Sequence, residues 1–170
     1  MPQPRDAVEL TVSTGYARTR SNRSATSWSG IGEGISSELG IGVRSLQWSV
    51  GLLGQYAELG RDRRGGAYTG SAGIAVAYHV MPDTRVDPWL GVTVGYRFIR
   101  TGGESHHGLE IVRLNAGADL RTTSLLAVGP RVSAGIDVFP SQLAGDAGWV
   151  LIGMVGIAGR FELSTAIVAD

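Results

Sequence analysis

The stretch Trp89-Leu90-Gly91-Val92-Thr93-Val94-Gly95-Tyr96-Arg97-Phe98 decides the fold class, because two kinds of residue alternate along it. Leu, Val, Val, Tyr and Phe occupy the even positions, whereas Trp, Gly, Thr, Gly and Arg occupy the odd ones. Successive residues of a β-strand point to opposite faces. The stretch therefore predicts a strand with one large apolar face and one face made mostly of small or charged residues.

The same alternation recurs along the chain between polar or Gly/Pro-rich clusters. Each segment is long enough for the roughly 9–11 residues that a tilted strand needs to cross a bilayer, whereas strands in soluble proteins average about 5–6. We predict an all-β fold, an eight-stranded antiparallel up-and-down transmembrane β-barrel. Its strands are expected at Ala7–Thr19, Gly34–Arg44, Gln47–Gly60, Ala67–Val80, Trp89–Arg100, Gly108–Arg121, Ala127–Phe139 and Gly148–Leu163.

The connections alternate in length, which predicts the orientation of the barrel. The set Arg20–Glu33, Arg61–Gly66, Thr101–His107 and Pro140–Ala147 is mostly longer than the set Ser45-Leu46, Met81–Pro88 and Thr122–Leu126. Outer-membrane barrels have short periplasmic turns and longer outer loops. We expect both termini in the periplasm, and one domain over residues 1–170, with strands from about 7 to 163 and a tail at 164–170.

The character of the second strand face distinguishes two barrels that are inside-out versions of each other. A soluble lipocalin-like carrier of an apolar ligand would turn the aliphatic face inward and expose the other face to water. That other face consists mainly of Gly, Ala, Ser and Thr, and Gly makes up 26 of the 170 residues, about twice the usual ~7%. Small residues suit the narrow interior of an eight-stranded barrel. The pattern favours the membrane barrel, with the soluble carrier as an alternative.

Aromatic residues stand near both ends of the predicted strands, as in the two girdles where membrane barrels meet the lipid headgroups. The expected girdle residues are Tyr16, Trp48, Tyr56, Tyr68, Tyr78, Trp89, Tyr96, Phe98, Phe139, Trp149 and Phe161.

Charged residues on the small-residue faces are expected inside the barrel, where an unpaired charge would be prohibitive. We predict that arginines pair there with carboxylates and plug the interior; a narrow polar pore for ions or small solutes is the alternative. The predicted network contains Glu9, Glu38, Arg97, Arg113, Asp119, Arg131, Asp137, Arg160 and Glu162, with Gln55 and His79 also facing inward.

Composition excludes several function classes. The chain has 15 basic residues, all Arg, and 15 acidic ones, so no net charge attracts it to nucleic acid. Without cysteine it has no disulfide, thiolate nucleophile or cysteine-ligated metal. No apolar run is long enough for a transmembrane helix. Residues 1–4, Met-Pro-Gln-Pro, lack the apolar core of a signal peptide, so export would require this to be the processed chain.

Two loop segments carry chemistry worth testing. Arg61, Arg63 and Arg64 form a basic outer loop that could bind lipopolysaccharide phosphates, although a solvated hairpin loop is the favoured explanation. Glu104-Ser105-His106-His107 contains a nucleophile and bases, but its spacing matches no catalytic pattern, and adjacent histidines on a strand point oppositely. We expect no catalytic residues, no metal site and no cofactor.

Val86-Asp87-Pro88-Trp89-Leu90-Gly91, followed by Gly95-Tyr96-Arg97-Phe98, resembles the turn-and-strand pattern of small outer-membrane β-barrels such as the OmpA transmembrane domain and OmpX. The resemblance implies a monomer in the bacterial outer membrane, in contact with its lipids and lipopolysaccharide and inserted by the barrel-assembly machinery. It also implies a structural, envelope-integrity or surface-interaction role. Such barrels often end on an aromatic residue, and Phe161 is similar, but further residues follow it.

Overall fold

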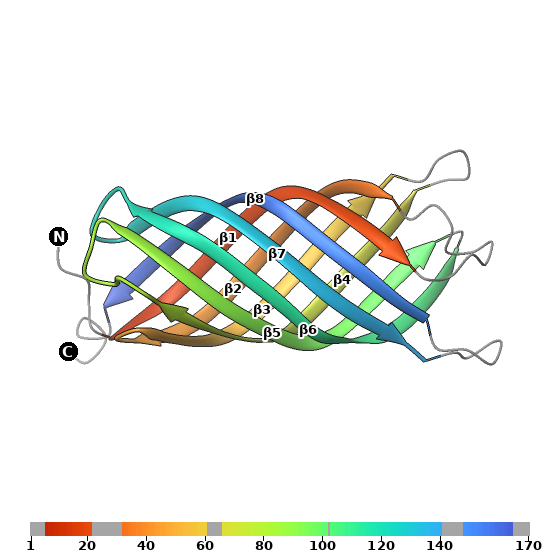
Figure 1. The fold of residues 1–170 in the computed structure, drawn as a ribbon, viewed down its shortest axis with the longest axis horizontal. Helices are drawn as coiled ribbons and strands as arrows, with labels where there is room; N and C mark the ends of the chain where they lie inside the picture. Colours follow the sequence, from red (N-terminus) through yellow and green to blue (C-terminus); the bar gives the residue numbers. More distant parts are fainter. Residues whose placement is uncertain (1–5, 22–31, 61–65, 102, 141–147, 165–170) are drawn as a thin grey trace.

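The protein is a closed antiparallel barrel of eight strands, each hydrogen-bonded to its sequence neighbours, with β1 also pairing with β8 (Figure 1). The computed structural model describes residues 6–21, 32–60, 66–101, 103–140 and 148–164. Among these residues, no helix is long and apolar enough to span a membrane. The strands are β1 (Asp6–Ser21), β2 (Glu33–Ser45), β3 (Trp48–Leu59), β4 (Ala67–His79), β5 (Val86–Thr101), β6 (Glu104–Arg121), β7 (Leu126–Phe139) and β8 (Gly148–Ser164).

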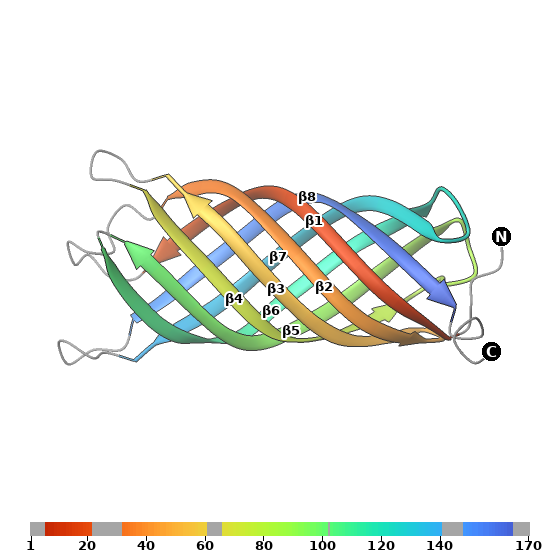
Figure 2. The ribbon, with the colours of Figure 1, turned by 180° about the vertical axis from the view of Figure 1, so that it is seen from behind.

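The predicted fold class is confirmed, and each predicted strand is present. β1 begins and β8 ends at the same end of the barrel, which we call the terminal end; the opposite end is the loop end (Figure 2). The main errors concern β5 and β6. β5 begins at Val86 and includes Pro88, and β6 begins at Glu104, so residues 102–103 alone separate the two strands. The predicted loop Thr101–His107 is therefore wrong: its polar residues extend a hairpin, in whose turn Gly103 has a φ of 90°.

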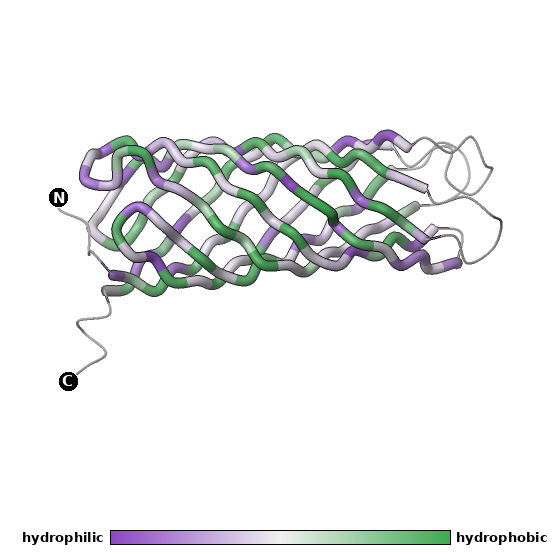
Figure 3. The backbone as a smooth tube through the Cα atoms, turned by 60° about the horizontal axis from the view of Figure 1, so that its bottom comes forward, coloured by the Kyte–Doolittle hydropathy of each residue, from purple (hydrophilic) through white to green (hydrophobic). Residues whose placement is uncertain are grey.

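The aliphatic faces cover the outside of the barrel. Apolar positions, coloured green, recur along the strands (Figure 3). Leu52 is 63% exposed and Leu90 61% exposed, whereas Arg97 on the opposite face of β5 is fully buried. A soluble apolar-ligand carrier would need the reverse arrangement. The structure thus has the inside-out pattern of a membrane barrel.

One β-bulge changes the alternation within β6. Glu110 pairs with Gly95 and Arg113 pairs with Thr93, so two residues of β6 oppose Val94 alone. On the other side, Glu110 pairs with Asp137 and Val112 with Ile136, which leaves Ile111 as the extra residue. A bulge reverses the facing of the residues beyond it. Glu110 consequently points inward, although strict alternation from Arg113 would place it outside.

Glycines face each other across neighbouring strands where the barrel wall needs close backbone approach. Gly15 pairs with Gly156, and Gly73 pairs with Gly95. A Cβ on Gly73 would lie 2.4 Å from the carbonyl oxygen of Val94, and one on Gly15 would lie 2.3 Å from that of Val155. The abundance of glycine at inward positions therefore has a steric cause.

Candidate functional site

The interior of the barrel is organised in layers, and the layer nearest the loop end is apolar. Leu59, Ile99 and Phe139 meet there and are at most 3% exposed. The full apolar layer consists of Ala17, Ala57, Leu59, Ala67, Ile99, Phe139, Val150 and Ile152. This layer differs from the predicted interior of small and charged residues. Its signal was present in the sequence, because inward positions at the loop ends of the strands are aliphatic.

Below the apolar layer lies a central ion layer of three arginines and three carboxylates, namely Glu38, Arg97, Glu110, Arg113, Arg131 and Asp137. Arg97 lies between two acids: it pairs with Glu110, and its Nε is 2.8 Å from Oδ2 of Asp137. It also donates to Oε1 of Gln55 at 3.0 Å.

Two further arginines link the central ion layer across the barrel. Arg113 reaches Glu110 at 3.1 Å and Glu38 at 3.4 Å. Arg131 reaches Oε2 of Glu38 at 2.7 Å. All six charged residues are at most 4% exposed, and the numbers of positive and negative side chains are equal. This balance allows the charges to be buried together.

Trp89 joins the central layer to a second ion layer. The guanidinium carbons of Arg131 and Arg160 lie 5.7 Å and 5.3 Å from its ring centroid. Its Nε1 donates to Oδ1 of Asp119 at 3.2 Å. Trp89 packs against Gly117, its partner across the β5–β6 pair, where a Cβ would lie 2.7 Å from the ring. Cation–π contacts of this kind stabilise buried guanidinium groups.

The terminal ion layer contains Glu9, Arg44, His79, Asp87, Asp119, Arg121, Arg160 and Glu162. Arg44 reaches Glu162 at 2.9 Å and Asp87 at 3.0 Å. Arg121 reaches the other oxygen of Glu162 at 2.6 Å. These contacts come from β2, β5, β6 and β8, so the ion pairs cross the interior rather than following the wall.

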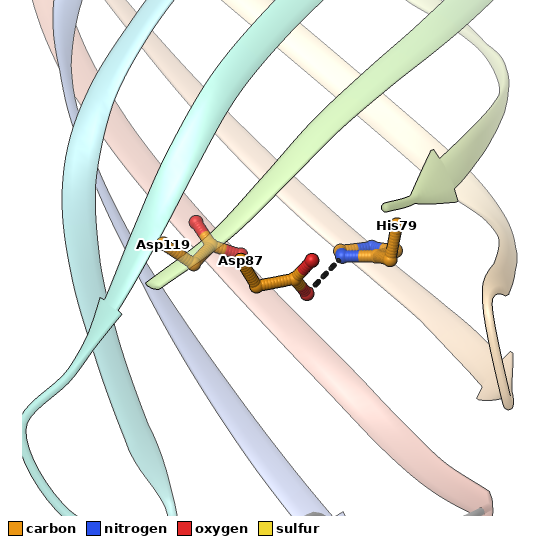
Figure 4. A group of neighbouring side chains, drawn as sticks. All are labelled: His79, Asp87 and Asp119. Atoms are coloured by element: carbon orange, nitrogen blue, oxygen red, sulfur yellow. Dashed lines mark hydrogen bonds and ion pairs between the residues drawn. The ribbon is translucent and has the colours of Figure 1, made fainter. Parts of the chain in front are cut away.

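Three members of the terminal ion layer have a spacing that suits a metal ion. His79, Asp87 and Asp119 each place a ligand atom within 4.8 Å of the others (Figure 4). However, Nη1 of Arg160 lies 2.9 Å from Nε2 of His79 and 2.7 Å from Asp119, and Arg44 binds Asp87. Because guanidinium donors already provide the positive charge at this position, the cluster fits arginine better than a metal.

A cavity of about 70 Å³ lies between the ion layers, and its polar lining includes Glu9, Thr93, Asn115, Arg131 and Arg160. Each buried water needs about 10–15 Å³ of such space and two to four polar partners. The cavity therefore suits a few water molecules and is too small for an organic solute.

The structure brings every residue of the predicted interior network into one of the two ion layers. Arg44, Asp87, Glu110 and Arg121 also belong to these layers but were not predicted. Alternation was sufficient for Arg44 and Arg121, because they share faces with Glu38 and Asp119. Asp87 lay in the predicted connection Met81–Pro88, and it faces inward because β5 begins earlier, at Val86. Glu110 had no such signal, since only the bulge turns it inward.

Two of the expected girdle residues lie inside the barrel, which corrects the prediction. Trp89 is 5% and Phe139 is 3% exposed, in the ion layers and the apolar layer respectively. Both alternate in step with inward arginines, and assigning them by residue type alone overrode that pattern. The other predicted aromatics lie on the outward faces, namely Tyr16, Trp48, Tyr56, Tyr68, Tyr78, Tyr96, Phe98, Trp149 and Phe161.

The two loop candidates have different outcomes. Arg61, Arg63 and Arg64 lie outside the described residues. Residues Glu104–His107 belong to β6, where His106 is half-buried, 3.9 Å from Glu104, and His107 contacts the hydroxyl of Tyr96. Strand alternation separates Ser105 from the adjacent His106, and His107, on the same face as Ser105, contacts the Tyr96 hydroxyl, so the segment is not assembled as a nucleophile and base.

Comparisons with known proteins bear on the fold. No protein-family model and no curated protein sequence matches this chain. Its structure is similar to that of Neisserial surface protein A, with a TM-score of 0.72 and 14% identity over 92% of this chain and 97% of that one. It is also similar to the outer membrane protein OprG of Pseudomonas aeruginosa, with a TM-score of 0.55 and 13% identity over 95% and 99% of the two chains.

A third similar structure is the N-terminal β-barrel domain of Pseudomonas aeruginosa OprF, with a TM-score of 0.53 and 15% identity over 96% and 100% of the two chains. The chain has the fold of a small outer-membrane barrel. None of these three proteins is named as an enzyme. At such low identity the likeness concerns the fold alone.

Proposed function

We propose that this protein is an integral outer-membrane β-barrel with a closed interior and a structural, envelope-integrity or surface-interaction role. The observation that carries the proposal is the layered filling of the interior. An apolar layer and two ion-pair layers succeed one another along the barrel axis, and a small cavity lies between the ion layers.

The outer surface supports the membrane placement. Aliphatic residues cover the middle of each strand, and tyrosines or tryptophans such as Trp48, Tyr56, Tyr96 and Trp149 stand toward the strand ends. Aromatic rings with a polar tip are favoured at the two membrane interfaces. We place the terminal end in the periplasm because the described turns there are short, as in known outer-membrane barrels.

The closed interior favours a structural role over transport. A conducting pore needs a continuous polar path. Here the apolar layer of Leu59, Ile99 and Phe139 interrupts the polar interior near the loop end. No catalytic role is proposed, because the buried charges are engaged with one another and the Ser/His segment is not assembled.

Detergent refolding tests the membrane placement. A barrel that folds in detergent should migrate faster on a gel before heating than after it, because the closed barrel resists unfolding by the gel detergent. Folding to high yield in buffer without detergent or lipid would contradict the proposal.

Trp48, outside the barrel, and Trp89, inside it, provide a further check. The chain has four tryptophans, so the comparison uses two single-tryptophan variants in which the other three are phenylalanine. Brominated lipids should quench the variant that keeps Trp48 more strongly than the variant that keeps Trp89.

A further inference from the structure

The outer face of β2–β4 carries a groove at the loop end, just beyond the apolar surface. The groove has a volume of about 480 Å³, and its polar lining consists of Glu33, Tyr56, Glu58 and Tyr68. These residues lie above the aliphatic positions of their strands. In the proposed orientation, this level is occupied by the lipid headgroups of the outer leaflet.

Arg100 of β5 stands beside the groove, in contact with the lining residue Tyr68. Its Nη1 donates to the hydroxyl of Tyr68 at 2.9 Å, and its guanidinium carbon lies 5.9 Å from the centroid of that ring. Tyr68 in turn packs edge-on against Phe98, and its ring centroid is 6.2 Å from that of Tyr56. Within the described part of the chain, no carboxylate lies within ion-pairing distance of Arg100. Its remaining N–H donors are available to an external anion.

We propose that this groove and Arg100 bind the phosphorylated sugar headgroup of an outer-leaflet glycolipid. This inference rests on the proposed membrane placement and deepens it by naming a lipid and a site. The guanidinium group binds phosphate through paired N–H donors. The tyrosine rings offer apolar faces to the C–H side of a sugar, and Glu33 and Glu58 accept hydrogen bonds from its hydroxyls.

The combination of one arginine, two tyrosine rings and two carboxylates favours a phosphorylated sugar over a simple anionic phospholipid. A phospholipid phosphate would use Arg100 alone, and the two carboxylates of the groove would oppose it. A sugar headgroup uses the carboxylates as acceptors and places its phosphate beyond them, at Arg100. The site therefore lies on the barrel wall, on β2–β5.

Lipid retention in native mass spectrometry tests the proposal. The whole chain is inserted into phosphatidylcholine nanodiscs containing an equal small fraction of lipid A, dephosphorylated lipid A or phosphatidylglycerol. The wild type should retain lipid A in preference to both other lipids. Arg100→Gln should lower lipid A retention about three- to tenfold, and the pair Tyr56→Leu with Tyr68→Leu should remove the preference over phosphatidylglycerol.

Arg85→Gln is the matched control, because Arg85 is an exposed arginine in the turn at the opposite end of the barrel. This variant should retain lipid A like the wild type. Equal retention by the wild type and Arg100→Gln, or equal retention of lipid A and phosphatidylglycerol by the wild type, would overturn the site. Either result in a folded, heat-modifiable barrel would leave the membrane placement intact, so the two failures are distinguishable.

Discussion

At the scale of single residues, the interior arginines are the groups whose burial most needs explanation. Arg97 is fully buried yet lies between the carboxylates of Glu110 and Asp137. Removing one partner of a buried ion pair leaves the other charge without compensation. Arg97 has two such partners, so its removal should lower the free energy of unfolding more than the removal of an arginine that has one partner.

Replacing Arg97 with alanine should lower the free energy of unfolding by about 3–5 kcal/mol, because two buried carboxylates lose their shared cation. Urea titration of the refolded protein in detergent, followed by gel mobility or tryptophan fluorescence, measures this change. Arg100→Ala is the control on the same strand; its side chain is exposed, and the expected change is under about 0.5 kcal/mol. Equal effects of the two substitutions would contradict the assignment of Arg97 to a buried ion layer.

The residue scale also shows what alternation can and cannot predict. Faces follow from sequence wherever a strand is regular, as for Arg113 and Arg131. Trp89 was misplaced although its face was evident, because its aromatic character was given more weight than its position. The inward facing of Glu110 could not be predicted, because a bulge depends on the register of two neighbouring strands rather than on the local sequence.

At the scale of strands, paired glycines determine how closely the backbone of the wall can pack. Gly73 and Gly95 face each other on β4 and β5, and neither has room for a Cβ.

The ends of the strands were harder to predict than their number and order. Pro88 and the polar segment at the start of β6 both suggested breaks, yet a closed barrel continues pairing through them because each strand has a partner on both sides.

Gly73→Ala should destabilise the barrel by about 1–3 kcal/mol, since the added methyl group would meet the Val94 carbonyl and force the strands apart. Gly54→Ala is the matched control: its Cβ would have no atom closer than 3.8 Å. Thermal unfolding in detergent, detected by loss of the fast-migrating gel band, compares them. A Gly73→Ala protein as stable as Gly54→Ala would show that the close β4–β5 approach is not required.

At the scale of the whole molecule, the barrel resembles a soluble protein turned inside out, with lipid-facing aliphatics and a charged interior. The membrane-spanning length of the strands, their number and the placement of the apolar face outside all follow from the sequence. The division of the interior into one apolar and two ionic layers does not, because it depends on how far each strand is shifted along its neighbours. That layering underlies the claim that the interior is closed.

Single-channel recording in planar bilayers tests the closed interior most directly. We predict that the refolded protein, shown to be inserted by its heat-modifiable mobility, gives no steady current steps at moderate voltage. Combining Leu59→Ser with Ile99→Ser makes the apolar layer more polar and tests whether this layer blocks ion flow. This double variant should give a larger current than the unmodified protein. Steady openings of the unmodified protein, reproducible between preparations and dependent on ion charge, would contradict the closed interior and favour a narrow pore.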